Sequence, residues 1–255
     1  MRDKKGRFLK GIIPWNKGTN GLCKPNKTSF KKGHKFSKKI EEKRKETIFN
    51  RLSIKPNLKF NENLAYILGI IKGDGCININ KYTKGHIVIV HTIDKSLANN
   101  FYDSLKKLNL NPYMCLVPPR NGISKKNQYR IQAVSKKFCL WYNSLSLNKI
   151  KKLLDNRKKI IAFLKGFYEA EGCLCKQIKN KKRLRITLTH TDIKLLKLTK
   201  NLANKLNFNF ILNGPYDPSG FGKKLRYNFT INKQEEVKRF INVIKPCIKY
   251  GEKRI

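Results

Sequence analysis

The chain repeats itself once after residue 61, and this duplication limits the folds open to it. The segment NLAYILGIIKGDGCI (63–77) matches IAFLKGFYEAEGCL (161–174), and IVIVHTIDKSLANNF (87–101) matches ITLTHTDIKLLKLTK (186–200). Two further matches pair LKKLNLNPYMCLV (105–117) with ANKLNFNFILNG (203–214), and QYRIQAV (128–134) with RYNFTIN (226–232). Matching residues lie 97 to 99 positions apart, as do Asp74 and Glu171 or His91 and His190. Four matches at nearly one spacing indicate two copies of one structural unit.

Each copy predicts the same series of helices and strands. An apolar run ends at a glycine, and an alternating stretch then predicts a strand hairpin. A periodic helix follows (94–108; 192–206), then a second hairpin (112–134; 208–232) and a final helix (135–147; 233–245). The expected fold is α+β, an α-β-β-α-β-β-α unit repeated, with two antiparallel sheets that helices cover on one face.

The charge of the chain is unusual, with 58 Lys and Arg against 16 Asp and Glu, a formal net charge of +42. A coding bias that enriches Lys, Asn and Ile explains part of this excess. Self-repulsion of this size would be relieved by a polyanion, so nucleic acid is the expected partner. A membrane surface is a poorer candidate, because the sequence contains no long basic amphipathic helix. There is also no run of about 18 apolar residues and no signal peptide, so we expect a soluble, non-secreted protein.

Seven cysteines are present, at positions 23, 76, 115, 139, 173, 175 and 247, and none forms a C-x-x-C pair. Cys173 and Cys175 are separated by one residue, which is a poor spacing for zinc. Most of the others lie in apolar context, which favours buried, reduced thiols over metal ligands. A reducing compartment is therefore expected.

Both apolar runs end in an acid followed by a glycine, Asp74-Gly75 and Glu171-Gly172. The candidate N-caps are Asn61 or Asn63 for the first helix and Asp155 or Asn156 for the second. The glycines fit the left-handed residue that closes a helix, which places each acid at a helix C-terminus. The macrodipole is negative there, so a carboxylate costs roughly 0.3–1 kcal/mol. An unfavourable residue in both copies argues for a functional role.

A second acid, Glu169, precedes Glu171 by two residues, and such residues point away from each other on a helix. The position that matches Glu169 in the first copy is Lys72, so only Asp74 and Glu171 occur in both copies. A site with two carboxylates must therefore form between the two helices. Small residues four apart support close packing of these helices; they are Gly69 and Gly73 on the first helix, and Gly166 and Ala170 on the second.

Residues 1–60 differ from the duplicated body. They are dense in Lys and Gly with spaced aromatic residues, and Phe8-Leu9-Lys10-Gly11 is repeated as Phe30-Lys31-Lys32-Gly33. Composition alone would favour a disordered basic tail. The wording GRF-x-KG-x-x-PWNKG resembles the short modular DNA-binding repeats that accompany homing endonuclease domains. Residues 40–52 read as a helix that leads into a linker through Pro56. The expected domains are thus this basic extension (1–60), a first half (61–150) and a second half (151–255).

ILGIIKGDG and LKGFYEAEG resemble the nine-residue LAGLIDADG motif of homing endonucleases. Two motifs in one chain are similar to the single-chain branch of that family, and the sequences around them resemble those of its archaeal intron-encoded members. The resemblance implies two sheets that form a DNA-binding saddle and a monomer with internal pseudo-two-fold symmetry. It implies that Asp74 and Glu171 bind divalent metal and each cleave one strand, and that Gly73 and Ala170 belong to the metal site. Mg²⁺, with Mn²⁺ as a substitute, suits such oxygen ligands, and cleavage across the minor groove is expected to leave 3′ overhangs. Lys72 departs from the motif and is expected to shape the helix end.

Other residues are candidates for catalysis or DNA contact. A lysine that polarises the attacking water could be Lys95, Lys194 or Lys249. His91 and His190 lie at matching strand ends, where capping a turn or touching DNA is favoured over acting as a general base. The expected DNA-binding side chains on the hairpins are Lys81, Lys84, Arg130, Arg183, Arg185 and Arg226.

The leading hypothesis is a site-specific double-strand DNA endonuclease. The alternative is an RNA maturase that assists splicing of its intron on the same scaffold. Retention of both acids favours the nuclease and also counts against a catalytically silent DNA-binding regulator. The expected location is the nucleoid-associated cytoplasm of a prokaryote, or an organelle matrix.

Overall fold

A computed structural model describes residues 37–53, 55–79, 85–119, 126–176, 183–218 and 223–247. The chain divides into two units, residues 1–53 and 54–255. The described part of the first unit is helix α1 (Lys38–Ser53), where the sequence predicts a helix at 40–52. The repeats around Phe8 and Phe30 lie outside the described residues, as do Lys81, Lys84 and Lys249.

The second unit contains two four-stranded antiparallel sheets with the same topology, β1-β2-β4-β3 and β5-β6-β8-β7. The first sheet consists of β1 (Gly75–Ile79), β2 (His86–Thr92), β3 (Pro112–Val117) and β4 (Gln128–Val134). The second consists of β5 (Gly172–Lys176), β6 (Leu184–His190), β7 (Ile211–Tyr216) and β8 (Arg226–Ile231). The repeated topology confirms the α+β class and the two repeated units.

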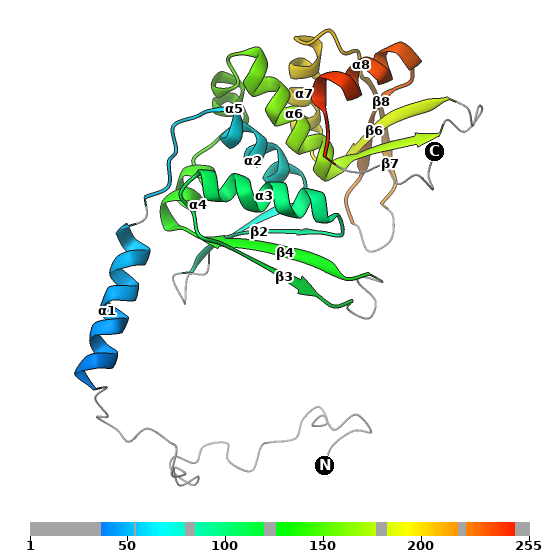
Figure 1. Ribbon diagram of the computed structural model, residues 1–255. Helices are drawn as coiled ribbons and strands as arrows, with labels where there is room; N and C mark the ends of the chain where they lie inside the picture. The colour runs from blue at the N-terminus through cyan, green and yellow to red at the C-terminus, as the bar shows by residue number, and fades with distance from the viewer. Residues whose placement is uncertain are drawn as a thin grey trace, which may run out of the picture. The chain divides into compact units, whose positions relative to one another are not determined.

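The helices of this unit lie above the strands of both sheets in Figure 1. They are α2 (Glu62–Gly73), α3 (Lys95–Lys107), α4 (Lys136–Asn143) and α5 (Leu147–Leu153) in the first half, and α6 (Arg157–Glu171), α7 (Ile193–Asn204) and α8 (Gln234–Ile244) in the second. The single final helix predicted at 135–147 is wrong for the first half, which has α4 and α5. Ser146 causes the restart, because its hydroxyl accepts a hydrogen bond from the Lys149 N–H at 3.2 Å.

Asparagine side chains cap the N-termini of α2 and α6, the two helices that lead to Asp74 and Glu171. Asn61 accepts from the Leu64 N–H at 2.9 Å, and Asn156 accepts from the Lys159 N–H at 3.0 Å. The left-handed conformation predicted after each helix is wrong, since Gly172 is extended at φ −89° and ψ 150°. Close packing requires glycine instead: a Cβ on Gly172 would lie 2.2 Å from the Tyr168 ring, and one on Gly75 would lie 2.4 Å from the Ile71 Cα.

In the described part of the duplicated unit, two matching asparagines are left-handed, as is Lys245 after α8. Asn109 has φ 57° after α3, and Asn207 has φ 60° after α7. Beyond each asparagine the chain turns back on its helix, where the Leu110 N–H donates to Leu105 and the Phe208 N–H to Ala203. This is a Schellman closure with asparagine in place of glycine.

Each sheet alternates buried and outward residues, so one face packs on helices and the other stays open. The helix-facing positions are fully buried, among them Val88, Val90, Ile131 and Ala133 in the first sheet and Ile186, Leu188, Phe229 and Ile231 in the second. Helix α2 contributes to both cores. Its Ile67 and Ile70 pack in the first core, whereas its Ala65 and Leu68 pack in the second with Phe163 and Phe167 of α6.

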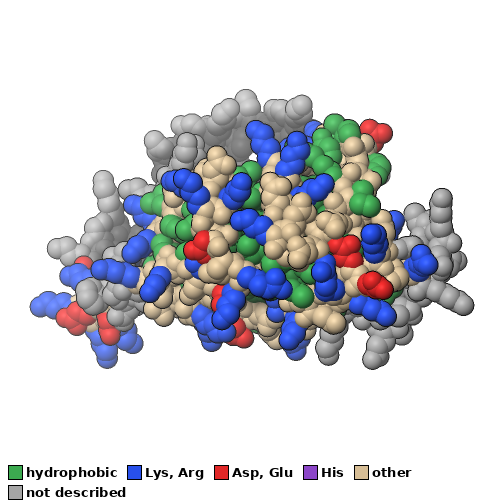
Figure 2. All heavy atoms as spheres, turned by 90° about the horizontal axis from the view of Figure 1, so that it is seen from above, with side chains coloured by type: hydrophobic (Ala, Val, Ile, Leu, Met, Phe, Trp, Pro, Cys, Tyr) green, Lys and Arg blue, Asp and Glu red, His purple; other side chains and the backbone are tan. Residues whose placement is uncertain are grey.

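Among the described residues no helix is long and apolar enough to cross a membrane. Figure 2 shows the helix-covered side, where Lys and Arg side chains are spread widely with few Asp and Glu between them. The described cysteines carry thiols, but the expectation that most are buried is fulfilled only by Cys139. Cys76 and Cys173 are exposed because they occupy matching outward positions on β1 and β5.

Candidate active site at the paired helix ends

Helices α2 and α6 pack backbone to backbone through the small residues singled out in the sequence. A Cβ on Gly69 would lie 2.2 Å from the Phe163 carbonyl oxygen, and one on Gly166 would lie 2.2 Å from the Tyr66 carbonyl oxygen. Real side chains do not tolerate such distances to backbone, so glycine is what allows the helices to approach. This packing aligns the two helices so that their C-terminal ends meet.

The meeting point brings together the residues before and at each acid. A Cβ on Gly73 would lie 2.5 Å from the Ala170 Cβ and 3.7 Å from Glu171 Oε1. Asp74 follows Gly73 directly, and its N–H donates to Ile70 to close α2. The structure therefore places Gly73, Ala170, Asp74 and Glu171 side by side. The last carbonyl groups of a helix lack intrahelical partners, so backbone oxygens are also available here.

Burial makes both carboxylates harder to ionise, and the charge of Asp74 adds to this effect at Glu171. Burial and the nearby Asp74 charge raise the pKa of Glu171 to about 8. Loss of water around Asp74 raises its pKa to about 6. Asp74 is the more exposed of the two residues, and the Glu171 side chain is 21% exposed. Like charges held close together in this way are typical of a site built for a cation.

His190 of β6 lies next to Glu171, with its Nε2 3.8 Å from Glu171 Oε1, too far for a hydrogen bond. Its Nδ1 accepts from the Asp192 N–H at 2.9 Å, which leaves the ring proton on Nε2, facing the acid. Burial lowers the pKa of His190, although Asp192 and the backbone of Lys72 act in the opposite direction. His190 therefore caps the turn before α7, as expected, and it also lies next to the Glu171 carboxylate.

The two histidines are not equivalent, contrary to the match made from the sequence. His91 pairs with Arg130 on β4, and Thr189 pairs with Asn228 at the corresponding position of the second sheet. His190 instead pairs with Tyr227, one position further along. A shift by one residue moves a side chain to the other face of a sheet. His91 consequently lies on the open face, whereas His190 packs against Phe167 of α6.

Glu169 points away from Glu171 and is 3% exposed. Its carboxylate accepts hydrogen bonds from the Tyr66 hydroxyl and the Cys247 backbone N–H, both at 2.6 Å. Burial and this carboxylate raise the pKa of the Cys247 thiol to about 12, and they also raise the pKa of Tyr66. Glu169 thus ties α2, α6 and the segment after α8 together. The lysine at the matching position of the first motif, Lys72, predicted correctly that Glu169 lies outside the acid pair. It did not predict the hydrogen bonds of Glu169 to Tyr66 and Cys247.

The lysines proposed from the sequence lie in different surroundings. Lys72 stacks on Tyr142, with Nζ 4.7 Å from the ring centroid, and burial lowers its pKa. Lys95 and Lys194 are exposed in the first turns of α3 and α7. In the described part of the chain neither forms an ion pair with Asp74 or Glu171.

The candidate DNA-binding arginines that the structure describes are on or beside the open sheet faces. Arg130 lies on β4, Arg185 on β6, Arg226 begins β8, and Arg183 is exposed just before β6. Arg185 Nε donates to the Cys175 sulfur at 3.2 Å, and Arg226 Nε donates to the Asp217 carbonyl at 3.1 Å. Sequence reasoning missed Gln132, although its spacing of two from Arg130 in a strand signals the same face.

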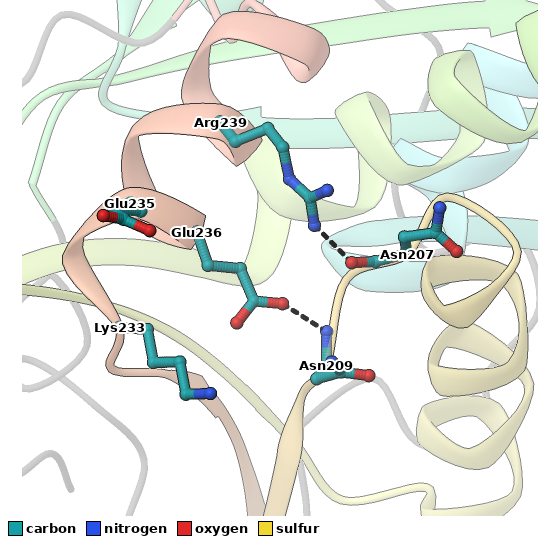
Figure 3. Close-up of a pocket in the computed structure, with 6 residues that line it drawn as sticks. All are labelled: Asn207, Asn209, Lys233, Glu235, Glu236 and Arg239. Carbon is teal, nitrogen blue, oxygen red and sulfur yellow. Dashed lines mark hydrogen bonds between the residues drawn. The ribbon is translucent and has the colours of Figure 1, made fainter.

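A separate hollow of about 300 Å³ lies between the start of α8 and the turn after α7. It is lined by Asn207, Asn209, Lys233, Glu235, Glu236 and Arg239 (Figure 3). Glu236 accepts from the Asn209 N–H, and Arg239 donates to the Asn207 carbonyl. These charged groups already join two parts of the second half, so the hollow is a structural junction away from the acid pair.

Two antiparallel sheets packed on a central helix pair make this fold similar to that of LAGLIDADG proteins, among them the homing endonuclease I-DmoI. Residues 158–245 match the family model for a LAGLIDADG-like domain. Structures of mesophilic variants of the homing endonuclease I-DmoI are 25% identical, with a TM-score of 0.51, over 72% of this chain and 94% of theirs. I-DmoI in complex with DNA and Mn gives the same identity and TM-score, over 72% of this chain and 96% of that one.

Other similar proteins widen the comparison. The N-terminal LAGLIDADG domain of DUF199/WhiA shares the fold at 15% identity, with a TM-score of 0.54, over 77% of this chain and 88% of that domain. Two uncharacterized proteins of Methanocaldococcus jannaschii also match. MJ0314 is 29% identical over 66% of this chain and 63% of the relative, and MJ0398 is 26% identical over 75% and 69%. The chain thus spans less than two thirds of MJ0314.

Proposed function

We propose that this protein is a site-specific double-strand DNA endonuclease that requires a divalent metal ion. The observation that carries the proposal is the meeting of Asp74 and Glu171, one from each half, at the ends of helices held together by glycine. A fold whose relatives include an endonuclease in complex with DNA and Mn supports the same reading. Two acids related by internal symmetry fit two strands of one duplex, and we expect each acid to serve one strand.

The residues at the helix ends fit a hard cation. They offer two carboxylates and helix-end carbonyls, and a positive ion would offset the burial and the repulsion from Asp74 that together raise the pKa of Glu171 to about 8. The described residues contain no group of three or more His, Cys, Asp or Glu side chains that could together hold a metal ion. Mg²⁺ binds through few carboxylates and keeps several waters, so this donor set suits Mg²⁺, with Mn²⁺ as a substitute. When bound, such an ion supplies the positive charge that phosphodiester hydrolysis needs.

The proposal also covers the ends of the cut DNA, the oligomeric state of the enzyme and its location in the cell. The two acids would act across the minor groove and leave 3′ overhangs, and the single chain would act as a monomer. Gly73 and Ala170 would line the metal site, and Lys95 or Lys194 would assist the attacking water once DNA is bound. We further propose an intron-encoded enzyme of the prokaryotic cytoplasm or an organelle matrix.

Substitution of the acids tests the proposal. A pool of randomised duplexes, selected for binding and then for cleavage with Mg²⁺, supplies a target. Asp74→Asn or Glu171→Gln should abolish double-strand cleavage of that target and leave binding within a few-fold. Glu235→Gln, an exposed acid of α8, is the matched control and should cut normally. If both active-site variants still cut at the wild-type rate, the site is misassigned.

An RNA maturase on the same scaffold is the alternative activity. RNA binding alone would not require two acids to be held together against their mutual repulsion. Tight binding of intron RNA with no cleavage of any selected duplex would favour the maturase.

A further inference from the structure

The turns after β2 and β6 are closed in the same way by two different side chains. In the first half the Thr92 hydroxyl accepts a hydrogen bond from the Asp94 N–H at 3.1 Å. In the second half His190 Nδ1 accepts from the Asp192 N–H at 2.9 Å. Thr92 and His190 occupy matching positions, since each is the last residue of its strand and pairs with the matching tyrosine of the neighbouring strand.

This comparison separates what the turn requires from what the histidine adds. A threonine closes the first turn, so turn closure does not require an imidazole ring. The threonine side chain ends at that hydrogen bond, whereas the imidazole has a second nitrogen on its far edge. That nitrogen, Nε2, lies 3.8 Å from Glu171 Oε1. His190 therefore presents to the acid of its own half a group that Thr92 lacks.

The His190 ring is held in place from several sides. Its Nδ1 is bound by the Asp192 N–H, which leaves the proton on Nε2. Phe167 of α6 packs against the ring, with the two centroids 5.9 Å apart. The ring also forms a hydrogen bond with the backbone of Lys72, in the last turn of α2. His190 thus lies where the ends of α2 and α6 meet, and its side chain is only 16% exposed.

The Lys72 backbone and the Glu171 carboxylate are alternative acceptors for the same Nε2–H. A carboxylate is the stronger acceptor, because a hydrogen bond to a charged group is about twice as strong as a neutral one. Shortening the 3.8 Å separation to a hydrogen bond of about 3 Å requires a shift of less than about 1 Å in the Glu171 side chain. Contacts of this kind are often long in the free enzyme and shorten in the complex.

We propose that His190 is a positioning residue for Glu171, whose carboxylate it orients by donating Nε2–H to one oxygen, so that the other faces a divalent ion. This inference rests on the proposed function. Carboxylates that bind metal are themselves hydrogen-bonded, and loss of such a partner lowers metal affinity or activity by about 10- to 100-fold. Thr92 offers no such donor on a long arm to Asp74. The two acid sites are therefore unequal, and His190 serves the cleavage of one strand.

Four substitutions separate positioning from turn closure. His190→Thr and His190→Asn keep an acceptor for the Asp192 N–H but are too short to reach Glu171. His190→Gln has the opposite balance, because its longer amide places an N–H donor near the position of Nε2. Thr92→Val removes the hydrogen bond that closes the first turn and is the matched control.

Single-turnover cleavage of a selected duplex, with its two strands labelled separately, measures the rate on each strand. With Mg²⁺, His190→Thr and His190→Asn should slow one strand by about 10- to 100-fold and the other far less, so that nicked duplex accumulates. His190→Gln should cut both strands at close to the wild-type rates. Thr92→Val should lower the midpoint of thermal unfolding and leave the ratio of the two rates unchanged.

Mn²⁺ binding gives a second readout that does not depend on cleavage. Each full-length variant is bound to the same pre-cut duplex and titrated with Mn²⁺, and the free ion is followed by electron paramagnetic resonance. His190→Thr should weaken binding of Mn²⁺ by about 10- to 100-fold at one site, and His190→Gln should retain it.

The outcomes distinguish this inference from the proposed function. Equal slowing of both strands in His190→Thr, or an unchanged Mn²⁺ affinity, would overturn the inference and leave the endonuclease intact. So would a loss in His190→Gln as large as that in His190→Thr, or an equal change of strand ratio in Thr92→Val, because either would assign the effect to the turn. Absence of metal-dependent cutting by the wild-type protein would instead overturn the proposed function, and the inference with it.

Discussion

Two carboxylates of one helix, two residues apart, have opposite surroundings. Glu169 accepts two hydrogen bonds at 2.6 Å from Tyr66 and Cys247, which replace the contacts with water that it loses inside the fold. Glu171 faces Asp74, and its pKa is raised to about 8. The first acid stabilises the protein and the second destabilises it. Mutations at the two positions should therefore change stability in opposite directions.

Glu171→Gln should stabilise the metal-free protein at pH 8 by about 1–3 kcal/mol, since one pKa unit corresponds to about 1.4 kcal/mol and partial exposure reduces the effect. The folded-state pKa is raised, so the folded protein holds a proton that the unfolded chain releases. Wild-type stability falls as pH rises from about 4.5 towards about 8. Urea unfolding in EDTA at pH 5 and pH 8 measures the effect, and the gain should shrink at pH 5. An equal or lower stability of the variant at pH 8 would contradict this account.

Glu169→Gln should lower the free energy of unfolding by roughly 1.5–3 kcal/mol, because two donors lose a charged acceptor. Tyr66→Phe removes one of these bonds. The double variant should lose less than the sum of the single losses, and a double-mutant cycle from urea unfolding measures the coupling. Asp103→Asn, on the exposed surface of α3, serves as the neutral control. Additive losses would show that the contact between Tyr66 and Glu169 contributes nothing.

At the scale of elements, the central feature is the helix pair α2 and α6. Its ends meet only because Gly69 and Gly166 have no side chain where the partner backbone passes. A misplaced helix would separate Asp74 from Glu171 without altering either acid. The packing of the two helices therefore controls the proposed chemistry through glycines that carry no functional group.

Gly166→Ala should destabilise the protein by about 1–3 kcal/mol or more, since the new Cβ would lie 2.2 Å from the Tyr66 carbonyl oxygen. Any folded fraction should cleave DNA more slowly, because the acids are moved apart. Thermal unfolding and a cleavage assay measure the two effects. Asn99→Ala, on the exposed side of α3, is the matched helical control and should be close to neutral. Wild-type stability in Gly166→Ala would contradict the close packing.

The sequence predicts the helices and strands well because the duplication shows the same pattern of residues twice. Both sheets, the paired helices and the positions of Asp74 and Glu171 follow from it. Predictions that depend on conformation or on distant partners were less reliable. Gly75 and Gly172 are needed for steric space and not for a left-handed turn. The histidine match slipped by one residue because a repeated HT pair outweighed the strand register. Cys247 reaches Glu169 from 78 residues away, and no local pattern encodes such a contact.

At the scale of the whole molecule, net charge is expected to govern the proposed binding of DNA. With a net charge of +42, the protein should release many counterions, so that affinity falls steeply with salt. Removal of residues 1–56 takes away much of the basic extension and leaves the unit from residue 54 nearly whole. The shortened protein should bind its selected duplex more weakly, with a shallower salt dependence, and should still cut. Filter binding between 50 and 200 mM salt provides the measurement, and an unchanged slope would show that the extension takes no part.

Because Ala65 and Leu68 of α2 are buried in the core of the second half, that core is incomplete without the first half. A single half made alone would expose an apolar helix face, and a second copy of itself could cover it.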